Sequence, residues 1–210
     1  MKRALFVVLP ALALLLAACS SSGSPAKPSG SELVVQNQVG QYQGAGLVPP
    51  QPRPSFTLTD TSGKPFSFGT QTAGHPTFLY FGYTNCPDIC PATMADLRLA
   101  LAKVPAAVAK KTYVVFVTTD VKHDTAAVIK QWLGNFDAQS TATWVGLTGT
   151  QDQIDAAQAA ARVTLAEDAG QTHAASVKLY GPDDYARVMF LNTNGEESQM
   201  AHDLPIVART

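Results

Sequence analysis

The sequence predicts an α/β protein in which a mixed β-sheet lies between helices. From residue 55 onward, segments with the apolar or alternating pattern of strands alternate with segments that have helical periodicity. The last strands flank a turn and precede a final helix, which adds antiparallel pairing to the sheet. The length of 210 residues fits one domain or two small ones, and a formal charge of −1 gives no basic stripe. We therefore expect no nucleic-acid partner.

The first 18 residues have the features of a signal peptide. Lys2 and Arg3 precede an almost wholly apolar run over 4–18, which is too short for an ordinary membrane-spanning helix. The run ends in Leu-Ala-Ala, and Cys19 follows at once, as in a bacterial lipobox. We predict that residues 1–18 are removed and that Cys19 is lipidated. The alternative is an ordinary signal peptide with a chance cysteine.

A lipidated Cys19 places the protein at a bacterial cell membrane, anchored on the extracytoplasmic side. Acyl chains stabilise such anchoring by ~0.8 kcal/mol per buried methylene. Because Ser, Gly and Pro dominate the next residues, we assign 19–40 to the lipidated cysteine and a flexible tether, and 41–210 to the folded domain. Cys86 and Cys90 are then the only thiols of that domain, in a compartment where disulfides persist.

The elements of the domain follow one another in a definite order. Residues 32–54 suggest only short extended pieces, while Thr150 with Gln153 forms a capping box for a helix. Pro105 is expected to end the first long helix early. Strands are expected at 55–60, after a turn within 61–66, at 77–83, at 112–120 and on both sides of a turn at 181–184. Helices are expected at 91–109, from 124 or 125 through 132, from 150 and from about 196.

Cys86 and Cys90 lie four positions apart in the loop between a central buried strand and its helix. Binding sites of open α/β sheets form beyond the carboxyl ends of strands, which is where this loop lies. Pro91 favours the first helical position, so Cys90 is a candidate N-cap, where backbone N–H groups and the helix dipole favour a thiolate. The spacing allows the two sulfurs either to form a bond or to point at one ion.

Three interpretations of this pair compete. A purely structural disulfide would close a small loop and constrain the unfolded chain little. A thiol–disulfide exchanger suits an exposed site at a helix N-terminus, although the usual redox motif has two intervening residues and this pair has three. Two thiolates could also bind a soft metal such as copper(I) or zinc, with a histidine as the third ligand.

Four histidines are candidates for that third ligand. His75 begins the central strand at the end away from the cysteines, and His202 falls in the expected terminal helix. His123 and His173 lie in loops that can converge on the cysteine loop. Spacing alone does not choose between these two.

The segment "LYFGYTNCPDICPATM", residues 79–94, resembles the signature of the Sco/SenC family of copper-binding thioredoxin-like proteins. "FTLTDTSGKPF" resembles that family's opening hairpin, and "VTTDVKHDT" resembles its strand ending in aspartate, with His123 where the family usually has arginine. His173, the small residues after it and the strand "VKLY" are similar to the surroundings of the family's ligand histidine. Asp184 stands where the family usually has glycine, a departure expected to strain its turn. The resemblance covers most of the chain from about residue 41.

The resemblance implies a thioredoxin-like fold with an N-terminal β-hairpin that binds a copper ion, Cu(I) or Cu(II), through Cys86, Cys90 and His173. It implies a chaperone, not an enzyme, that delivers copper to the dinuclear centre of cytochrome c oxidase. Its partner would be the copper-receiving subunit of the oxidase or another copper chaperone, and we expect a monomer. Two alternatives stay open. One is an extracytoplasmic thiol–disulfide reductase in which Cys86 and Cys90 form a disulfide, and the other is a copper or redox sensor.

Three acidic residues could support the ligands from the surrounding shell. These residues are Asp88, Asp120 and Asp124. Their alternative roles are a turn residue for Asp88, a strand-end residue for Asp120 and a helix cap for Asp124. The aromatic residues of the central strand and its end are interpreted as core residues, namely Tyr80, Phe81 and Tyr83.

Overall fold

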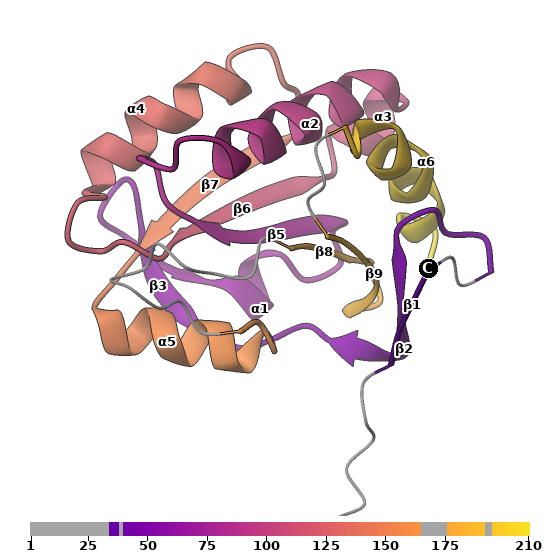
Figure 1. Ribbon diagram of the computed structural model, residues 1–210, viewed down its shortest axis with the longest axis horizontal. Helices are drawn as coiled ribbons and strands as arrows, with labels where there is room; N and C mark the ends of the chain where they lie inside the picture. The colour runs from indigo at the N-terminus through magenta and orange to yellow at the C-terminus, as the bar shows by residue number, and fades with distance from the viewer. Residues whose placement is uncertain (1–33, 38–39, 165–175, 192–194) are drawn as a thin grey trace, which may run out of the picture. The chain divides into compact units, whose positions relative to one another are not determined.

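A computed structural model describes residues 34–37, 40–164, 176–191 and 195–210. These residues form a nine-stranded sheet in the order β1-β2-β9-β8-β5-β6-β7-β3-β4 (Figure 1). Its strands are β1 Val34–Asn37, β2 Ala45–Pro52, β3 Thr57–Asp60, β4 Pro65–Ser67, β5 Thr77–Gly82, β6 Tyr113–Thr118, β7 Thr143–Thr148, β8 Val177–Tyr180 and β9 Tyr185–Phe190. The helices are α1 Phe68–Gln71, α2 Ile89–Lys103, α3 Ala106–Ala109, α4 Ala126–Asp137, α5 Gln151–Ala160 and α6 Glu197–Val207.

The pairing of the strands is mixed, as predicted. β6 lies parallel to both β5 and β7, whereas the other pairs are antiparallel. The expected opening hairpin is β3–β4, which lies at one edge of the sheet and pairs with β7. The predicted class, a mixed sheet between helices, is therefore confirmed.

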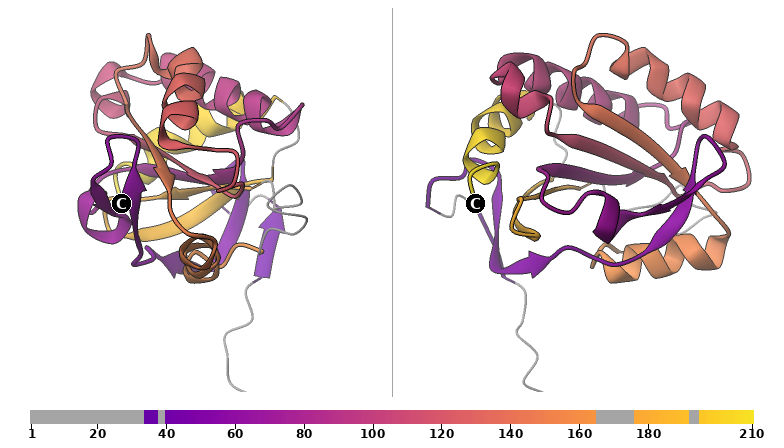
Figure 2. Two further views of the ribbon diagram at one scale, coloured as in Figure 1. Left: turned by 90° about the vertical axis from the view of Figure 1, so that its left-hand side faces the viewer. Right: turned by 180° about the vertical axis from the view of Figure 1, so that it is seen from behind.

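Each face of the sheet buries its own apolar cluster. Alternate residues of β5 point to opposite faces, as the strand period requires. Phe78 and Tyr80 pack in the cluster that includes residues of α2, α4 and α6, and Leu79 and Phe81 pack in the cluster that includes residues of α1 and α5. Figures 1 and 2 show these two helical layers on either side of the sheet. A strand buried on both faces explains the continuous apolar run of the sequence.

The ends of three helices can be compared with the caps and breaks predicted from the sequence. Thr125, not Asp124, caps α4, because its hydroxyl accepts a hydrogen bond from the N–H of Val128. The capping box of Thr150 and Gln153 is present at the start of α5. As expected, Pro105 separates α2 from the short α3.

The start of α2 corrects one prediction. The helix begins at Ile89, so Asp88 is the N-cap and Cys90 is already helical. Pro91 therefore lies within the first turn and not at its first position. This place is tolerated because N–H groups of the first turn have no intrahelical acceptor.

The N-terminal part of the chain remains largely a prediction. The signal peptide, Cys19 and most of the tether lie outside the described residues. The hint of extended pieces within 32–54 is confirmed by β1 and β2, which pair antiparallel. Within the described ranges, no helix combines the length and the hydropathy needed to cross a bilayer.

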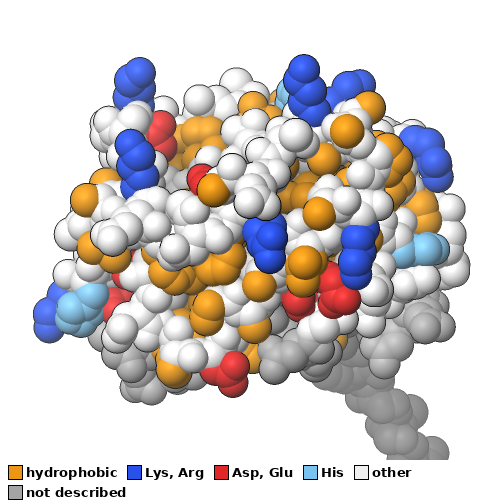
Figure 3. Space-filling model, turned by 90° about the horizontal axis from the view of Figure 1, so that it is seen from above, with side chains coloured by type: hydrophobic (Ala, Val, Ile, Leu, Met, Phe, Trp, Pro, Cys, Tyr) orange, Lys and Arg blue, Asp and Glu red, His pale blue; other side chains and the backbone are white. Residues whose placement is uncertain are grey.

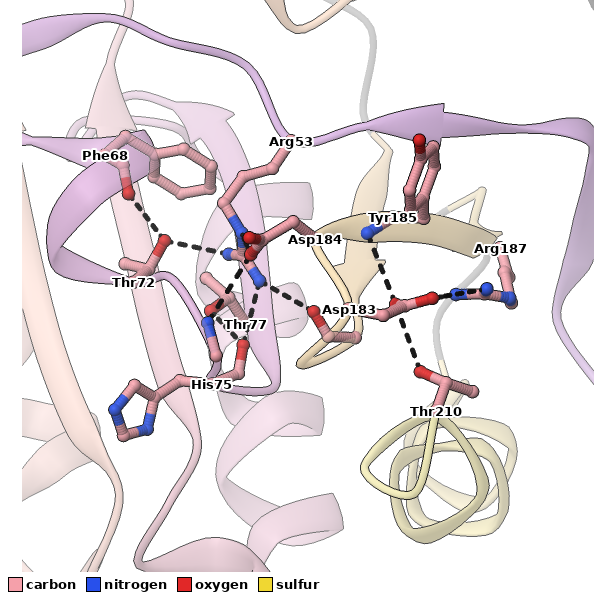
Figure 4. Close-up of polar contacts among 12 residues, drawn as sticks. Arg53, Phe68, Thr72, His75, Thr77, Asp183, Asp184, Tyr185, Arg187 and Thr210 are labelled. Atoms are coloured by element: carbon pink, nitrogen blue, oxygen red, sulfur yellow. Dashed lines mark hydrogen bonds and ion pairs between the residues drawn. The ribbon is translucent and has the colours of Figure 1, made fainter.

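The turn between β8 and β9 explains how an aspartate replaces the expected glycine. Asp184 has a φ of +65°, a left-handed conformation that costs most residues energy but that aspartate tolerates comparatively well. Its carboxylate accepts a hydrogen bond from Nε of Arg53 at 2.7 Å, and its carbonyl accepts one from the Arg53 N–H (Figure 4). Arg53 also donates to Thr72 and to the carbonyl of Gly181. The strain expected at this turn is thus offset by an ion pair with a buried arginine.

On the face seen in Figure 3, Lys and Arg side chains are scattered among hydrophobic and neutral ones and do not gather into a stripe. This distribution agrees with the balanced charge of the sequence. It gives a nucleic-acid backbone no continuous track on that face.

Candidate metal centre

Cys86 and Cys90 lie where β5 ends and α2 begins. Gly82, the last residue of β5, is paired with Thr118 at the end of β6, so the loops that follow these parallel strands leave the same edge of the sheet. The N–H of Thr119 donates to the carbonyl of Gly82 at 2.7 Å, which joins the two loops at their base. The predicted position of the cysteines, beyond the carboxyl end of the central strand, is confirmed.

The sulfur of Cys90 is buried in the apolar cluster below α2. The Tyr80 hydroxyl donates to it at 3.2 Å, and the backbone N–H of Tyr83 also donates to it. Burial raises the pKa of the Cys90 thiol to about 12, although these two donors oppose that rise. Cys90 is therefore held as a neutral thiol, and it releases its proton when it binds a metal or forms a disulfide.

The sulfur of Cys86 is only partly buried and accepts several hydrogen bonds. Burial raises its pKa, but donors outweigh that effect and leave the pKa lowered. These donors are the backbone N–H groups of Asp88 and Cys90, the latter at 3.3 Å, the Cys90 thiol and the Tyr83 hydroxyl. The first turn of α2 thus favours a thiolate, as predicted, but at Cys86 and not at Cys90.

Gly82 makes room for this arrangement. A Cβ at this position would lie 3.0 Å from the Cys90 sulfur and 2.8 Å from a ring carbon of Tyr80. Any larger residue would therefore push the buried sulfur or the aromatic ring out of place. The sequence prediction did not single out this glycine, and it treated Tyr80 and Tyr83 only as core residues. The closeness of Gly82, Tyr80 and Tyr83 to the two cysteines in the sequence was the signal that could have assigned these three residues to the site.

Asp124 and Asp120 connect the cysteine loop to the loop after β6. Asp124 is almost fully buried and accepts hydrogen bonds from the N–H and the hydroxyl of Thr84, and from the hydroxyl of Thr118. Asp120 is also buried and lies 2.7 Å from Nδ1 of His123. These contacts make Asp124 an anchor for the start of the cysteine loop.

Asp88 differs from the other two acidic residues. Its side chain caps no helical N–H, while its backbone N–H donates to Cys86 and its carbonyl accepts from Ala92 at 3.3 Å. Its observed contacts are therefore those of a turn and helix-start residue.

The histidines are separated by the fold. His75 precedes β5 at the opposite end from the cysteines, and His202 lies in α6, both as expected. His123 lies at the same sheet edge as the cysteines. His173 lies outside the described residues, so its role as third ligand remains a prediction. Among the residues that the structure describes, no three His, Cys, Asp or Glu side chains converge closely enough to hold a metal ion.

The described geometry supports two kinds of chemistry. Both cysteines carry reduced thiols, which are in hydrogen-bond contact with each other. Two sulfurs this close can bind one soft metal ion, or they can form the predicted disulfide once oxidised.

Comparisons with known proteins cover most of the domain. The family model described as SCO1/SenC matches residues 47–208. A relative from Stutzerimonas stutzeri, named as a putative copper-binding protein, is 31% identical over 140 residues, which are 64% of this chain and 66% of the relative. Mitochondrial protein SCO2 of Saccharomyces cerevisiae is 36% identical over 99 residues, covering 47% of this chain and 31% of that protein. The matches thus span between about a third and two thirds of these relatives' lengths.

Solved structures share the fold. The structure of Bradyrhizobium japonicum ScoI with copper bound matches with a TM-score of 0.60 and 28% identity, covering 74% of this chain and 98% of that one. The thioredoxin-like class predicted from the sequence is therefore confirmed.

Proposed function

This chain belongs to the SCO1/SenC family, and from that membership we propose that it is a copper chaperone. Cu(I) or Cu(II) is held by the sulfurs of Cys86 and Cys90 and by the imidazole of His173. The ion is delivered to the dinuclear copper centre of cytochrome c oxidase, either directly to the copper-receiving subunit or through another copper chaperone. Lipidation of Cys19 keeps the donor at the outer face of the bacterial cell membrane, beside its acceptor.

The observation that carries this proposal is the contact between two unequal thiols at the end of β5. Cys86 has a lowered pKa and is partly exposed, so it is the sulfur that meets an incoming ion first. Cys90 is fully buried in an apolar cluster, which would keep water away from its side of a bound ion. Thiolates select Cu(I), and an imidazole suits either oxidation state. The copper bound in the Bradyrhizobium japonicum ScoI structure supports the choice of metal.

The test is an anaerobic copper titration of the reduced full chain, followed by stoichiometry and by thiolate-to-copper absorption. The wild-type chain is expected to bind one copper, and Cys86→Ser and His173→Ala are each expected to weaken binding and to reduce the copper content of the oxidase. His202→Ala, in α6, is the matched control and should bind as the wild type does. Full copper binding by the Cys86→Ser variant would overturn the proposal.

The inequality of the two thiols favours a second candidate, a thiol–disulfide reductase. The Cys86 thiolate would attack a partner's disulfide and release one partner thiolate, and Cys90 would then displace the second to leave a Cys86–Cys90 disulfide. This chemistry needs no histidine. If His173→Ala leaves oxidase loading intact while Cys86→Ser abolishes it, the reductase replaces the chaperone as the better account.

A further inference from the structure

The loop after β6 presents a histidine beside the cysteine loop. Because β5 and β6 are parallel and in register at Gly82 and Thr118, the residues that follow each strand emerge side by side. The bond from Thr119 to Gly82 and the bonds from Thr84 to Asp124 hold the two loops together.

Asp120 fixes the ring of His123 in one tautomer. Nδ1 of His123 lies 2.7 and 2.9 Å from the two carboxylate oxygens, and a carboxylate can only accept, so Nδ1 carries the proton. Asp120 is 4% exposed, whereas the His123 side chain is 57% exposed. Within the described part of the chain, no hydrogen bond reaches Nε2. Metal-binding histidines have this arrangement, with a carboxylate behind the ring and a free nitrogen in front.

Tyr83 connects this pair to the cysteines. Its hydroxyl donates a hydrogen bond to the sulfur of Cys86. The charges of Cys86 and Asp120 both act on the Tyr83 hydroxyl, so Tyr83 lies within electrostatic reach of the thiol and of the carboxylate. His123 does not converge with Cys86 and Cys90 as a third ligand among the described residues. His123 therefore belongs to the loop that emerges beside the cysteine loop, without being a ligand of the cysteine site.

We propose that His123 is a transfer ligand, whose Nε2 binds copper while the ion passes between Cys86 and an acceptor. The step is a ligand exchange without a change of oxidation state. The Nε2–copper bond forms as the bond from Cys86 breaks, and the released thiolate keeps its electron pair or takes a proton from water. A single neutral imidazole holds copper less firmly than two thiolates do, so the ion is not trapped there. This inference rests on the proposed chaperone function.

The test measures how fast the Cu(I)-loaded full chain releases copper to the chelator bathocuproine disulfonate under anaerobic conditions. His123→Asn is the decisive variant, because its amide N–H can still donate to Asp120 but it lacks an imidazole. His123→Ala removes both features. His202→Ala is the matched control, since Nδ1 of His202 also lies 2.8 Å from a carboxylate, that of Asp203, but in α6.

We expect His123→Asn and His123→Ala to slow release about tenfold, the scale on which groups around a metal site act, with unchanged equilibrium affinity for Cu(I). His202→Ala should release copper at the wild-type rate. Wild-type release by His123→Asn overturns the inference, because it would show that His123 serves only to hold Asp120. Equal rates in all variants overturn it as well. Failure of the wild-type chain to bind Cu(I) would instead overturn the proposed function. That failure appears in the loading step, before any release rate is measured.

Discussion

The carboxylate of Asp124 accepts two hydrogen bonds from Thr84, a residue 40 positions earlier, one from its N–H at 2.9 Å and one from its hydroxyl. A third bond comes from the hydroxyl of Thr118 at 2.6 Å. The loop that bears the cysteines is therefore attached to the loop after β6 through one buried side chain.

Asp124→Asn should loosen the cysteine loop. The amide has one acceptor oxygen where the carboxylate has two, so the bond donated by the Thr84 hydroxyl is lost or must reverse, and the remaining bonds lose their charge assistance, at a cost of about 1–3 kcal/mol. We expect this loss in urea unfolding, together with faster hydrogen exchange at Thr84. Asp152→Asn, on the exposed start of α5, is the control and should change stability by less than about 0.5 kcal/mol. Equal effects of the two substitutions would contradict the anchoring role.

Gly82→Ala should damage the site through overpacking. The added methyl would lie within 3.0 Å of the Cys90 sulfur and of the Tyr80 ring, which should cost about 1–3 kcal/mol. Copper affinity should fall with stability, because the buried sulfur is displaced. Gly134→Ala, in α4, should instead stabilise the protein, because no atom of the described residues lies within 4 Å of the added methyl. Thermal unfolding and copper titration of both variants check this contrast.

Alkylation should distinguish the two cysteines. With iodoacetamide near neutral pH, the reduced protein should be modified at Cys86 much faster than at Cys90, because only Cys86 is accessible and has a lowered pKa. The midpoint of the Cys86 pH–rate profile should lie below the ordinary value of 9.0. Tyr83→Phe removes one donor and should move that midpoint upward. Tandem mass spectrometry identifies the modified residue, and equal rates at both cysteines would refute the assignment.

Asp184→Gly should destabilise the protein even though glycine adopts a positive φ more easily. It removes the carboxylate that pairs with Arg53, whose side chain is 2% exposed, and a buried donor without its partner costs about 1–3 kcal/mol. Asp184→Asn tolerates the same φ and keeps an acceptor oxygen, so it should lose less stability than the glycine variant. Urea unfolding of the two variants measures the difference, and a glycine variant at least as stable as the wild type would contradict this account.

Lys178 should make stability depend on pH in the alkaline range. Burial lowers its pKa from 10.5 to about 8, and its ammonium group donates to Gln51 and to the carbonyls of Ala161 and Arg162. Between these two pKa values, Lys178 is protonated in the unfolded chain but neutral in the folded chain. The contribution of Lys178 to the free energy of unfolding therefore rises with pH in this range and is level below about 8.

The control for this prediction is Lys178→Met, which has no group that titrates in that range. The difference in unfolding free energy between the wild type and the variant should grow in favour of the wild type as pH rises from 8 toward 10.5. The other groups that titrate at these pH values are common to both proteins and cancel. A constant difference would show that the pKa of Lys178 is not lowered in the folded state.

Features that depend on near neighbours were predictable from the sequence. The buried run of β5, the capping box at Thr150 and the interruption at Pro105 follow from periodicity and from local hydrogen bonding. The order of strands and helices also placed Cys86 and Cys90 at the carboxyl end of the central strand.

Tertiary packing decided the properties that depend on distant residues. Burial under α2 makes Cys90 the neutral thiol, and donors from the first helical turn and from Tyr83 make Cys86 the sulfur with the lowered pKa. Asp124 was a candidate cap by sequence, yet its donors come mainly from another loop. Asp184 is stabilised in its turn because the fold brings Arg53 to its carboxylate. A local pattern carries no information about which remote group will supply a hydrogen bond or exclude water, and those two effects set the chemistry of this site.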